Sequence, residues 1–351
     1  MKAAVVYSRL PEGRLASDDD DRFEEFDAPD VPAAVAAALG RLGYPACAIE
    51  DDTRLVGRLR RERPDFVVNL AEGRSGRGRE AIVPSICEHL GLPYTGSDAL
   101  TLAASLDKDV AKRLVSPFVE VAPGLLVRPG EALPEVAFPA IVKPVCEGSS
   151  KGIRDGASVV SDPEALAEQV HRVTQRYGQP ALVEAYVEGA ELTAAVLGSE
   201  QPFVAALMQA IPRSGDPHRF VYSLEAKRDW HNRVRYAVPP ELPPAALAAL
   251  EHAALAAFAA LGCRDVARID FRVTRDGRPV FLEANPLPGL SPEKGDIVIA
   301  TRAAGLTYDA LIGAIVARAA GEATRAQASR EVAGPPGLPS AWSTSHSISE
   351  A

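Results

Sequence analysis

Residues 266–286 read VARIDFRVTRDGRPVFLEANP, and this stretch predicts two antiparallel strands joined by a tight turn. Asp276-Gly277 lies between two strand-like runs, and this dipeptide favours a two-residue type I′ hairpin loop. Side chains alternate along each strand, so the polar side chains share one face of the hairpin and the apolar ones the other. The polar face then carries two facing pairs and one further arginine: Asp270 with Glu283, Arg268 with Asn285, and Arg272.

Two carboxylates that face each other across a hairpin are destabilising unless something neutralises them, because their Cβ atoms lie only about 5 Å apart. A divalent cation would neutralise them, since Mg²⁺ takes oxygen ligands from one or two carboxylates together with substrate phosphates. The hairpin therefore predicts a metal site formed by Asp270, Glu283 and Asn285, with Arg268 holding an anion beside it. The alternative is a solvated face on which Arg268 and Arg272 pair with the acids.

A Gly/Ser-rich turn follows another predicted strand, Phe138 to Val145, which carries Lys143. The turn reads Glu147-Gly148-Ser149-Ser150-Lys151-Gly152. Glycines let backbone N–H groups approach phosphate oxygens, while serine hydroxyls and a lysine add donors and charge. The spacing is not that of a Walker A loop, and no GxGxxG follows the first predicted strand, which weighs against a dinucleotide-dependent dehydrogenase. An ordinary hairpin turn is the alternative.

Two further acids, Glu184 and Glu191, flank the short segment Tyr186-Val187 and Gly189 between two predicted strands. Carboxylates at such a position could accept hydrogen bonds from an adenine amino group and from ribose hydroxyls. Surface acids without a ligand are the alternative.

The remaining pattern predicts an α/β protein of three parts and a tail. Lys2 to Ser8 and Phe66 to Leu70 fit buried strands, and Asp30 can cap a helix between them, which favours a parallel sheet. A long amphipathic helix is expected over 243–261 and a lid over 211–236 around Lys227. The predicted ranges are an N-terminal α/β domain over 1–104, a small central subdomain over 105–196, a C-terminal subdomain over 197–325, and a disordered tail over 326–351.

Composition limits the function classes. The 351 residues include 38 Lys and Arg against 47 Asp and Glu, a net charge of −9, which argues against nucleic-acid binding. The four cysteines are widely spaced and predict reduced thiols rather than a metal or disulfide framework. No stretch has the composition of a signal peptide or membrane span, so we expect a cytoplasmic protein. The acidic run within 17–30 predicts a solvated loop.

These pieces follow one another in an order that resembles the ATP-grasp superfamily, and within it the D-alanine–D-alanine ligase family. The ordered segments are GLPYTGS before Lys108, then KPVCEGSSKG, VEAYVEGAE, EAKRDW, RIDFRV and FLEANPLPGL. The resemblance covers residues 64 to about 320. It implies an ATP-grasp fold with a Rossmann-like N-terminal domain followed by two ATP-grasp subdomains.

The resemblance also implies roles for individual residues. Lys108 and Lys143 would contact ATP phosphates beneath the mobile loop of residues 147–152, in which Ser149 reaches the reactive site. The other implied roles are adenine binding by Glu184 and Val187, ribose binding by Glu191, γ-phosphate closure by Lys227, two Mg²⁺ ions on Asp270, Glu283 and Asn285, and stabilisation of the reacting acyl group by Arg268 and the Gly289 backbone.

The activity implied is formation of an amide in two steps. One carboxylate attacks the γ-phosphate of ATP to give an acyl phosphate and ADP, and a second substrate's amine then displaces phosphate. The resemblance further implies Mn²⁺ as a substitute for Mg²⁺, small amino-acid-like substrates and a homodimer.

Departures from the family pattern affect the substrate sites. The segment after the first strand reads Tyr7-Ser8-Arg9-Leu10-Pro11, without the Gly pair or the Glu that holds the first substrate's ammonium. Glu72 or Glu80 could substitute for it, and Lys294 replaces a serine that contacts the second substrate. We therefore expect a ligase for amino-acid-like substrates other than two D-alanines. The alternatives are a true D-alanine–D-alanine ligase and a non-catalytic nucleotide-binding module.

Overall fold

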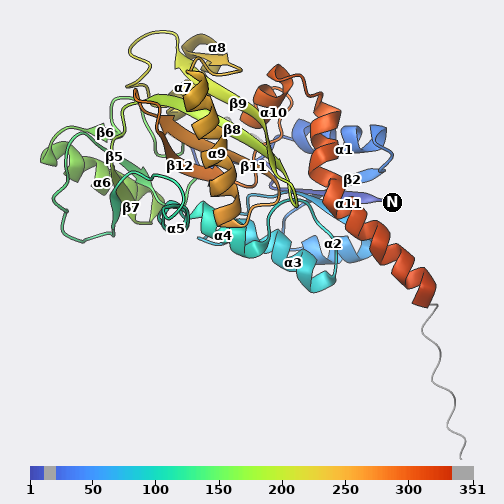
Figure 1. Ribbon diagram of the computed structural model, residues 1–351. Helices are drawn as coiled ribbons and strands as arrows, with labels where there is room; N and C mark the ends of the chain where they lie inside the picture. Colours follow the sequence, from blue (N-terminus) through green and yellow to red (C-terminus); the bar gives the residue numbers. More distant parts are fainter. Residues whose placement is uncertain (12–20, 334–351) are drawn as a thin grey trace, which may run out of the picture.

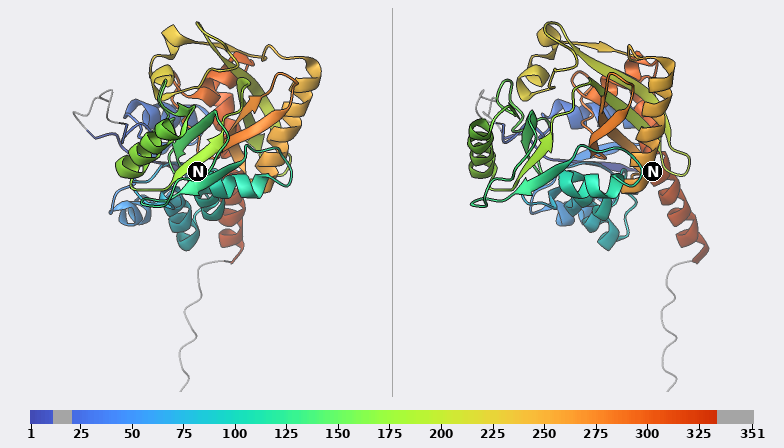
Figure 2. Two further views of the ribbon diagram at one scale, coloured as in Figure 1. Left: turned by 90° about the vertical axis from the view of Figure 1, so that its left-hand side faces the viewer. Right: turned by 60° about the vertical axis from the view of Figure 1, so that its left-hand side comes forward.

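The computed structural model describes residues 1–11 and 21–333, and for residues 330–333 it describes the backbone alone. The described chain forms three sheets flanked by helices (Figure 1). In the right-hand view of Figure 2 the small green sheet lies on one side, the yellow-to-orange sheet lies opposite it, and the blue N-terminal layer lies beneath both.

The N-terminal sheet is parallel, as predicted, with the strand order β2-β1-β3. Strands β1 and β3 are almost continuous apolar runs and are buried, which is typical of parallel strands covered on both faces. Asp30 begins α1 rather than capping it, since the side chain makes no cap hydrogen bond. The elements of this layer are β1 (Ala3–Tyr7), α1 (Asp30–Arg41), β2 (Ala46–Glu50), α2 (Leu55–Glu62), β3 (Phe66–Leu70), η1 (Arg79–Ala81) and α3 (Ile82–Leu90).

Two short helices, α4 (Ala99–Leu106) and α5 (Lys108–Val115), lead into a four-stranded sheet of order β4-β7-β5-β6. Helix α6 (Pro163–Tyr177) covers this sheet; Asp162 caps it by accepting from the Ala165 N–H, and Gly178 ends it in the left-handed conformation. The strands are β4 (Gly124–Val127), β5 (Ala140–Pro144), β6 (Val159–Val160) and β7 (Ala181–Ala185).

The third sheet is antiparallel and has the order β10-β9-β8-β11-β12. Helix α9 (Pro244–Leu261) lies along it and buries Leu250, Ala254 and Phe258 against the sheet. Among the described residues, helix α9 is long and apolar enough to suit a membrane span, and the bent pair α10–α11 is a second candidate. The packing of α9 on the sheet accounts for its apolar composition. The strands are β8 (Ala190–Gly198), β9 (Phe203–Pro212), β10 (Val234–Ala237), β11 (Asp265–Val273) and β12 (Pro279–Asn285).

The two strands expected to form one small module, β7 and β8, belong to different sheets. Strand β7 lies between β4 and β5, whereas β8 lies between β9 and β11. The chain therefore changes sheets between residues 185 and 190, earlier than the boundary predicted after residue 196. The domain ranges themselves stay predictions.

The hairpin β11–β12 forms the predicted facing pairs, although its loop length and register differ from the prediction. Thr274 and Arg278 close a loop of three residues, 275–277, with Gly277 at φ +85°, so the two-residue turn is wrong. A register shift between Asp270 and Phe271 places one extra residue on β12. The longer loop and the bulge offset each other, so Asp270 still faces Glu283.

The predicted disordered tail begins too early. After α10 (Asp296–Ala303), the last helix α11 (Tyr308–Ala333) continues through residue 333 and extends beyond the body of the molecule (Figure 1). Gln327 on α11 donates a hydrogen bond of 2.6 Å to Asp65. Residues 326–333 are therefore helical, and the rest of the predicted tail lies outside the described residues.

Candidate functional site

The polar face of the β11–β12 hairpin is a network of charges with Arg268 at its centre. The guanidinium of Arg268 lies 2.9 Å from Asp270 Oδ2 and 3.0 Å from Asp296 Oδ2, with Glu283 Oε1 at 3.7 Å. Thr193 on β8 donates to the other Asp270 oxygen at 2.8 Å. Asp296, at the start of α10, is an acid of this network that the sequence reasoning missed.

Burial and neighbouring charges shift the pKa values of the two facing carboxylates in opposite directions. Burial raises the pKa of Asp270, and the charge of Glu283 adds to that rise. Burial also opposes ionisation of Glu283, but Lys108 and Arg268 outweigh it and hold the pKa of Glu283 at about 2. Lys108 Nζ lies 3.0 Å from Glu283 Oε2.

The donors on this face fit Mg²⁺ when phosphate oxygens complete the coordination shell. Among the described residues no group of three His, Cys, Asp or Glu side chains is placed to hold a metal ion. The predicted set is two carboxylates and the Asn285 amide, and Mg²⁺ is commonly held by one or two carboxylates together with substrate phosphates. The Asn285 amide donates a hydrogen bond of 3.3 Å to Asp270 Oδ2.

A cavity of about 920 Å³, open in part to solvent, lies between the four-stranded and five-stranded sheets; we call it the intersheet cavity. At the edge of this cavity, two lysines from different elements pair with one acid. Lys143 and Lys112 lie 2.6 and 2.7 Å from the oxygens of Glu184. Glu191 pairs with Arg272 at 2.8 Å. The predicted residues that line this cavity are Lys143, Ser150, Glu184, Val187, Glu191, Lys227, Arg268, Asp270 and Glu283.

The sequence reasoning missed Lys112 and two tyrosines at this cavity. Lys112 lies four residues after Lys108 on α5, and this helical spacing was its only available signal. Tyr222 and Tyr236 share a hydrogen bond between their hydroxyl groups, and both rings line the cavity. Burial raises the pKa of both phenols, so they stay neutral hydrogen-bonding groups at neutral pH.

The Gly/Ser-rich loop lies against the end of this cavity in a strained conformation. Ser149 and Ser150 have φ of +49° and +58°, a region that L residues rarely adopt. The Gly148 N–H donates to Glu25 Oε1 at 2.7 Å, and a Cβ at Gly148 would lie 2.6 Å from that oxygen, so a side chain there would displace the Glu25 carboxylate. Lys108 Nζ donates to the Glu147 carbonyl.

The predicted lid over 211–236 is tied to that loop. Ser150 Oγ donates to the Tyr222 carbonyl at 2.9 Å, and the Leu224 N–H donates to the Ile153 carbonyl at 3.0 Å. Short helices α7 (Leu224–Arg228) and α8 (Trp230–Arg233) follow. These hydrogen bonds hold the segment against the loop, and Lys227 reaches the cavity, 3.6 Å from Asp296.

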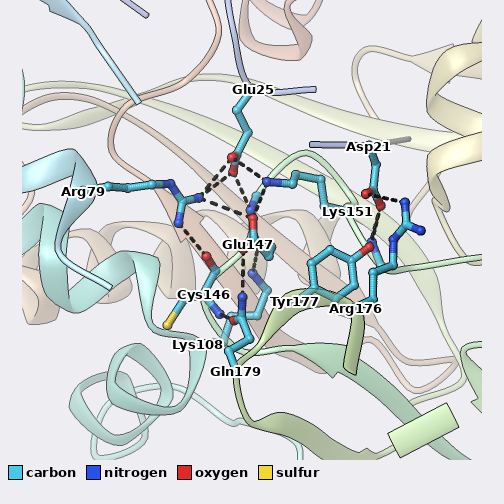
Figure 3. A network of polar contacts seen from close by, with 12 residues as sticks. Asp21, Glu25, Arg79, Lys108, Cys146, Glu147, Lys151, Arg176, Tyr177 and Gln179 are labelled. Carbon is cyan, nitrogen blue, oxygen red and sulfur yellow. Dashed lines mark hydrogen bonds and ion pairs between the residues drawn. The ribbon is translucent and has the colours of Figure 1, made fainter. Parts of the chain in front are cut away.

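The segment predicted as a solvated loop after β1 is only partly solvated where the structure describes it: residues 23–28 are half-buried and Asp21 is buried. Glu25 binds Arg79 at 2.9 Å and Lys151 at 3.1 Å, and Figure 3 shows both cations converging on its carboxylate. Asp21 is fully buried, and the same view shows it with Arg176 and Tyr177 of α6. The acids are buried because cations from distant segments pair with them; residues 17–20 of this prediction lie outside the described residues.

A second cavity of about 530 Å³, also open in part to solvent, adjoins the hairpin on its other side; we call it the acidic cavity. It brings together residues that are far apart in the sequence. Those that were predicted as site residues are Glu72, Glu80, Lys108, Gly148, Ser149, Arg268, Glu283, Asn285 and Gly289. Glu25 joins them from the segment after β1, where no sequence signal had marked it.

Two predicted residues lie elsewhere. Lys294 is exposed and lines neither cavity. The Glu147 carboxylate also faces away from both, since it pairs with Lys151 and accepts from Gln179 at 2.8 Å (Figure 3).

Known proteins resemble this chain in both sequence and structure. The family model described as the D-ala D-ala ligase C-terminus matches residues 129–317. A D-alanine–D-alanine ligase of Moorella thermoacetica is 33% identical over 296 residues, 81% of this chain and 91% of that protein. An uncharacterized protein of Sinorhizobium fredii, y4sG, is 33% identical over 301 residues, 82% of this chain and 86% of that protein.

The solved structures agree on the fold. The D-alanine–D-alanine ligase of Bacillus anthracis, determined as a complex with ATP, superposes with a TM-score of 0.70 at 21% identity, covering 93% of this chain and 99% of that one. The predicted ATP-grasp fold is thereby confirmed. The chain belongs to the D-alanine–D-alanine ligase family of ATP-grasp enzymes, which are ATP-dependent ligases that form C–N bonds.

Proposed function

We propose that this protein joins the carboxylate of one amino-acid-like substrate to the amine of another, using ATP and Mg²⁺. The observation that carries the proposal is that the intersheet and acidic cavities share Arg268 and Glu283. A nucleotide in one cavity and a carboxylate substrate in the other would meet at these two side chains. That arrangement suits transfer of a phosphoryl group between them.

The residues of the intersheet cavity are proposed to bind ATP. Glu184 and Val187 would hold the adenine, Glu191 the ribose, and Lys143 and Lys227 the phosphates, together with Lys108 from the adjoining acidic cavity. Lys143 already pairs with a carboxylate, and it can exchange that partner for a phosphate oxygen. Asp270, Glu283 and Asn285 would hold Mg²⁺, whose charge offsets that of the phosphates.

The proposed chemistry places Arg268 at both steps. A donor carboxylate oxygen attacks the γ-phosphorus of ATP, the bond to the bridging oxygen breaks, and ADP leaves. The amine of the acceptor then attacks the acyl carbon, and inorganic phosphate leaves with its bonding pair. Arg268, Ser149 and the Gly289 N–H would stabilise the oxygens on which charge develops.

We propose that the donor is not D-alanine. Ser8, at the end of β1, hydrogen-bonds to Asp51 and to the Gly73 N–H, so it serves the protein's own structure. The cavity beside Arg268 instead contains two glutamates without a partner among the described residues, Glu72 and Glu80, whereas one small zwitterion carries a single ammonium group. The competing function, D-alanine–D-alanine ligation, is favoured by the name of the Moorella thermoacetica relative.

Several further features stay predictions. They are the role of Glu147 in the phosphate-binding loop, the role of Lys294 toward the second substrate, replacement of Mg²⁺ by Mn²⁺, a homodimer, and a cytoplasmic location.

The test is steady-state release of ADP by the purified protein with Mg²⁺, using D-alanine alone and a panel of D- and L-amino acids in pairs. We expect ADP release that depends on both metal and amino acid, with products identified by mass spectrometry. Tight ATP binding without turnover on any pair would contradict the ligase proposal. Saturation by D-alanine at low-millimolar concentration with the highest turnover of the panel would restore the competing function.

A further inference from the structure

Two carboxylates in the acidic cavity have no partner in the described part of the chain. Glu72 and Glu80 both line the cavity, and no hydrogen bond or ion pair of either side chain occurs among the described residues. Glu80 is only 7% exposed. A buried carboxylate without a partner is destabilising, so Glu80, with the half-buried Glu72 in the same cavity, indicates a ligand that supplies the missing charge.

The backbone is built to bring these two acids together. Glu72 follows β3, and the next residue, Gly73, has φ +71° and packs so closely on η1 that a Cβ would lie 2.4 Å from the Arg79 carbonyl oxygen. The Gly73 N–H donates to Ser8 Oγ at 3.0 Å, which fixes the segment to the end of β1. Glu80, the second residue of η1, is thereby held close to Glu72.

The other charges that line the acidic cavity are already matched. Glu25 binds Arg79 and Lys151, and Glu283 binds Lys108. Arg79 is engaged by Glu25 and by the Cys146 carbonyl, to which it donates at 2.8 Å, and makes no hydrogen bond to Glu80. Two negative charges, those of Glu72 and Glu80, are therefore left for a ligand.

We propose that Glu72 and Glu80 each bind an ammonium group of the acyl donor, so that the donor is an amino acid with a second amine. This inference rests on the proposed ligase function. The donor's carboxylate would lie beside Arg268, at the end of the cavity shared with the intersheet cavity. A diamino carboxylic acid matches the two unpaired carboxylates one to one, whereas alanine leaves one of them buried and unpaired.

The electrostatics of the cavity agree with this assignment. Burial raises the pKa of Glu80 to about 8 and that of Glu72 well above its ordinary value. The Glu80 carboxyl therefore retains a proton at neutral pH, and binding of an ammonium group beside it should release that proton. The charged groups that act on the pair are Glu25, Asp27, Arg79, Lys108 and Glu147, together with each other.

The experiment measures the donor step alone. Hydroxylamine replaces the natural acceptor, so the acyl phosphate is converted to a hydroxamate and inorganic phosphate. Donors are 2,3-diaminopropionate, 2,4-diaminobutyrate and alanine, each as both enantiomers, with ATP and Mg²⁺. We expect kcat/KM for the best diamino acid to exceed that for alanine of the same configuration by about 100-fold or more, the range for a buried charge that lacks its partner.

Two variants and one control assign the preference to these residues. Glu80→Gln and Glu72→Gln should each reduce the preference for the diamino acid to about 10-fold or less, mainly through KM. Glu251→Gln, on the exposed face of α9, should leave it unchanged. Calorimetry with a non-hydrolysable ATP analogue, in buffers of different ionisation enthalpy, should show proton release when the diamino acid binds.

The outcomes separate this inference from the ligase proposal. Equal kcat/KM for alanine and the diamino acids, or a preference that survives both glutamine variants, would overturn it. If no donor yields a hydroxamate but calorimetry shows selective binding of the diamino acid that either variant removes, the inference holds and the ligase proposal fails. Binding without such selectivity overturns the inference whether or not hydroxamate forms.

Discussion

The two cavities share Arg268 and Glu283 but differ in how their acids are paired. In the intersheet cavity Glu184 has two lysines, Glu191 has Arg272, and Asp270 has Arg268. In the acidic cavity Glu72 and Glu80 have no cation among the described residues. Cations that pair with a carboxylate can exchange it for a phosphate, whereas an unpaired buried carboxylate recruits a cation or takes up a proton. The difference underlies the proposals that an anionic ligand binds in one cavity and a substrate with ammonium groups in the other.

The largest effect on activity is expected when charge is removed where the two cavities meet. Glu283→Gln and Asp270→Asn should each reduce Mg²⁺-dependent ADP formation by about 1,000-fold or more, because the phosphates lose both the metal and its ligands. The assay uses folded protein, verified by circular dichroism. Asp276→Asn, on the exposed loop of the same hairpin, is the matched control and should retain full activity. Near-normal rates for either variant at ordinary Mg²⁺ would contradict the metal assignment.

A smaller effect is expected from unpairing the lysines of the intersheet cavity. Glu184→Gln leaves Lys112 and Lys143 buried without their shared partner and should lower the free energy of unfolding by about 3–5 kcal/mol. Urea denaturation measures the change. Glu188→Gln removes only a surface pair with Arg219 and should cost less than about 1 kcal/mol. Equal stability of the two variants would show that this cavity does not depend on its internal pairs.

Removing a charge from the acidic cavity should raise the free energy of unfolding toward pH 8 instead of lowering it. The ordinary pKa of Glu80 is about 4.5, and its pKa in the folded protein is about 8, so between these pH values the folded state binds more protons than the unfolded chain. Its contribution to stability therefore falls as pH rises, by about 1.4 kcal/mol per pH unit. Glu80→Gln should remove this slope and become more stable than the native protein toward pH 8.

Urea denaturation at a series of pH values from 5 to 8 checks the sign, with Glu251→Gln as the variant that should follow the native curve. A Glu80→Gln curve parallel to the native one would show that Glu80 titrates normally and that the cavity is not strained by unpaired acid.

Local patterns predicted the parts of the site that lie on one element or on neighbouring ones. Alternation along a strand placed Asp270 opposite Glu283, and glycine and serine content marked the loop of residues 147–152. The pairing was correct although the turn was not, because the three-residue loop and the bulge offset each other. Recognition of the family came from the order of such patterns, which does not depend on the details of any turn.

The sequence by itself thus determined the three-part α/β architecture, the hairpin's charged face and the lysines near it. The tertiary structure alone decided that β7 and β8 belong to different sheets, that residues 326–333 are helical, and that Glu25 reaches the Gly/Ser-rich loop. The physical reason is that hydrophobic periodicity and turn chemistry act over a few residues, whereas a buried acid depends on cations more than 50 residues away in the chain. Whether Glu25 is paired and Glu80 is not could only be settled once Arg79 had a place in the fold.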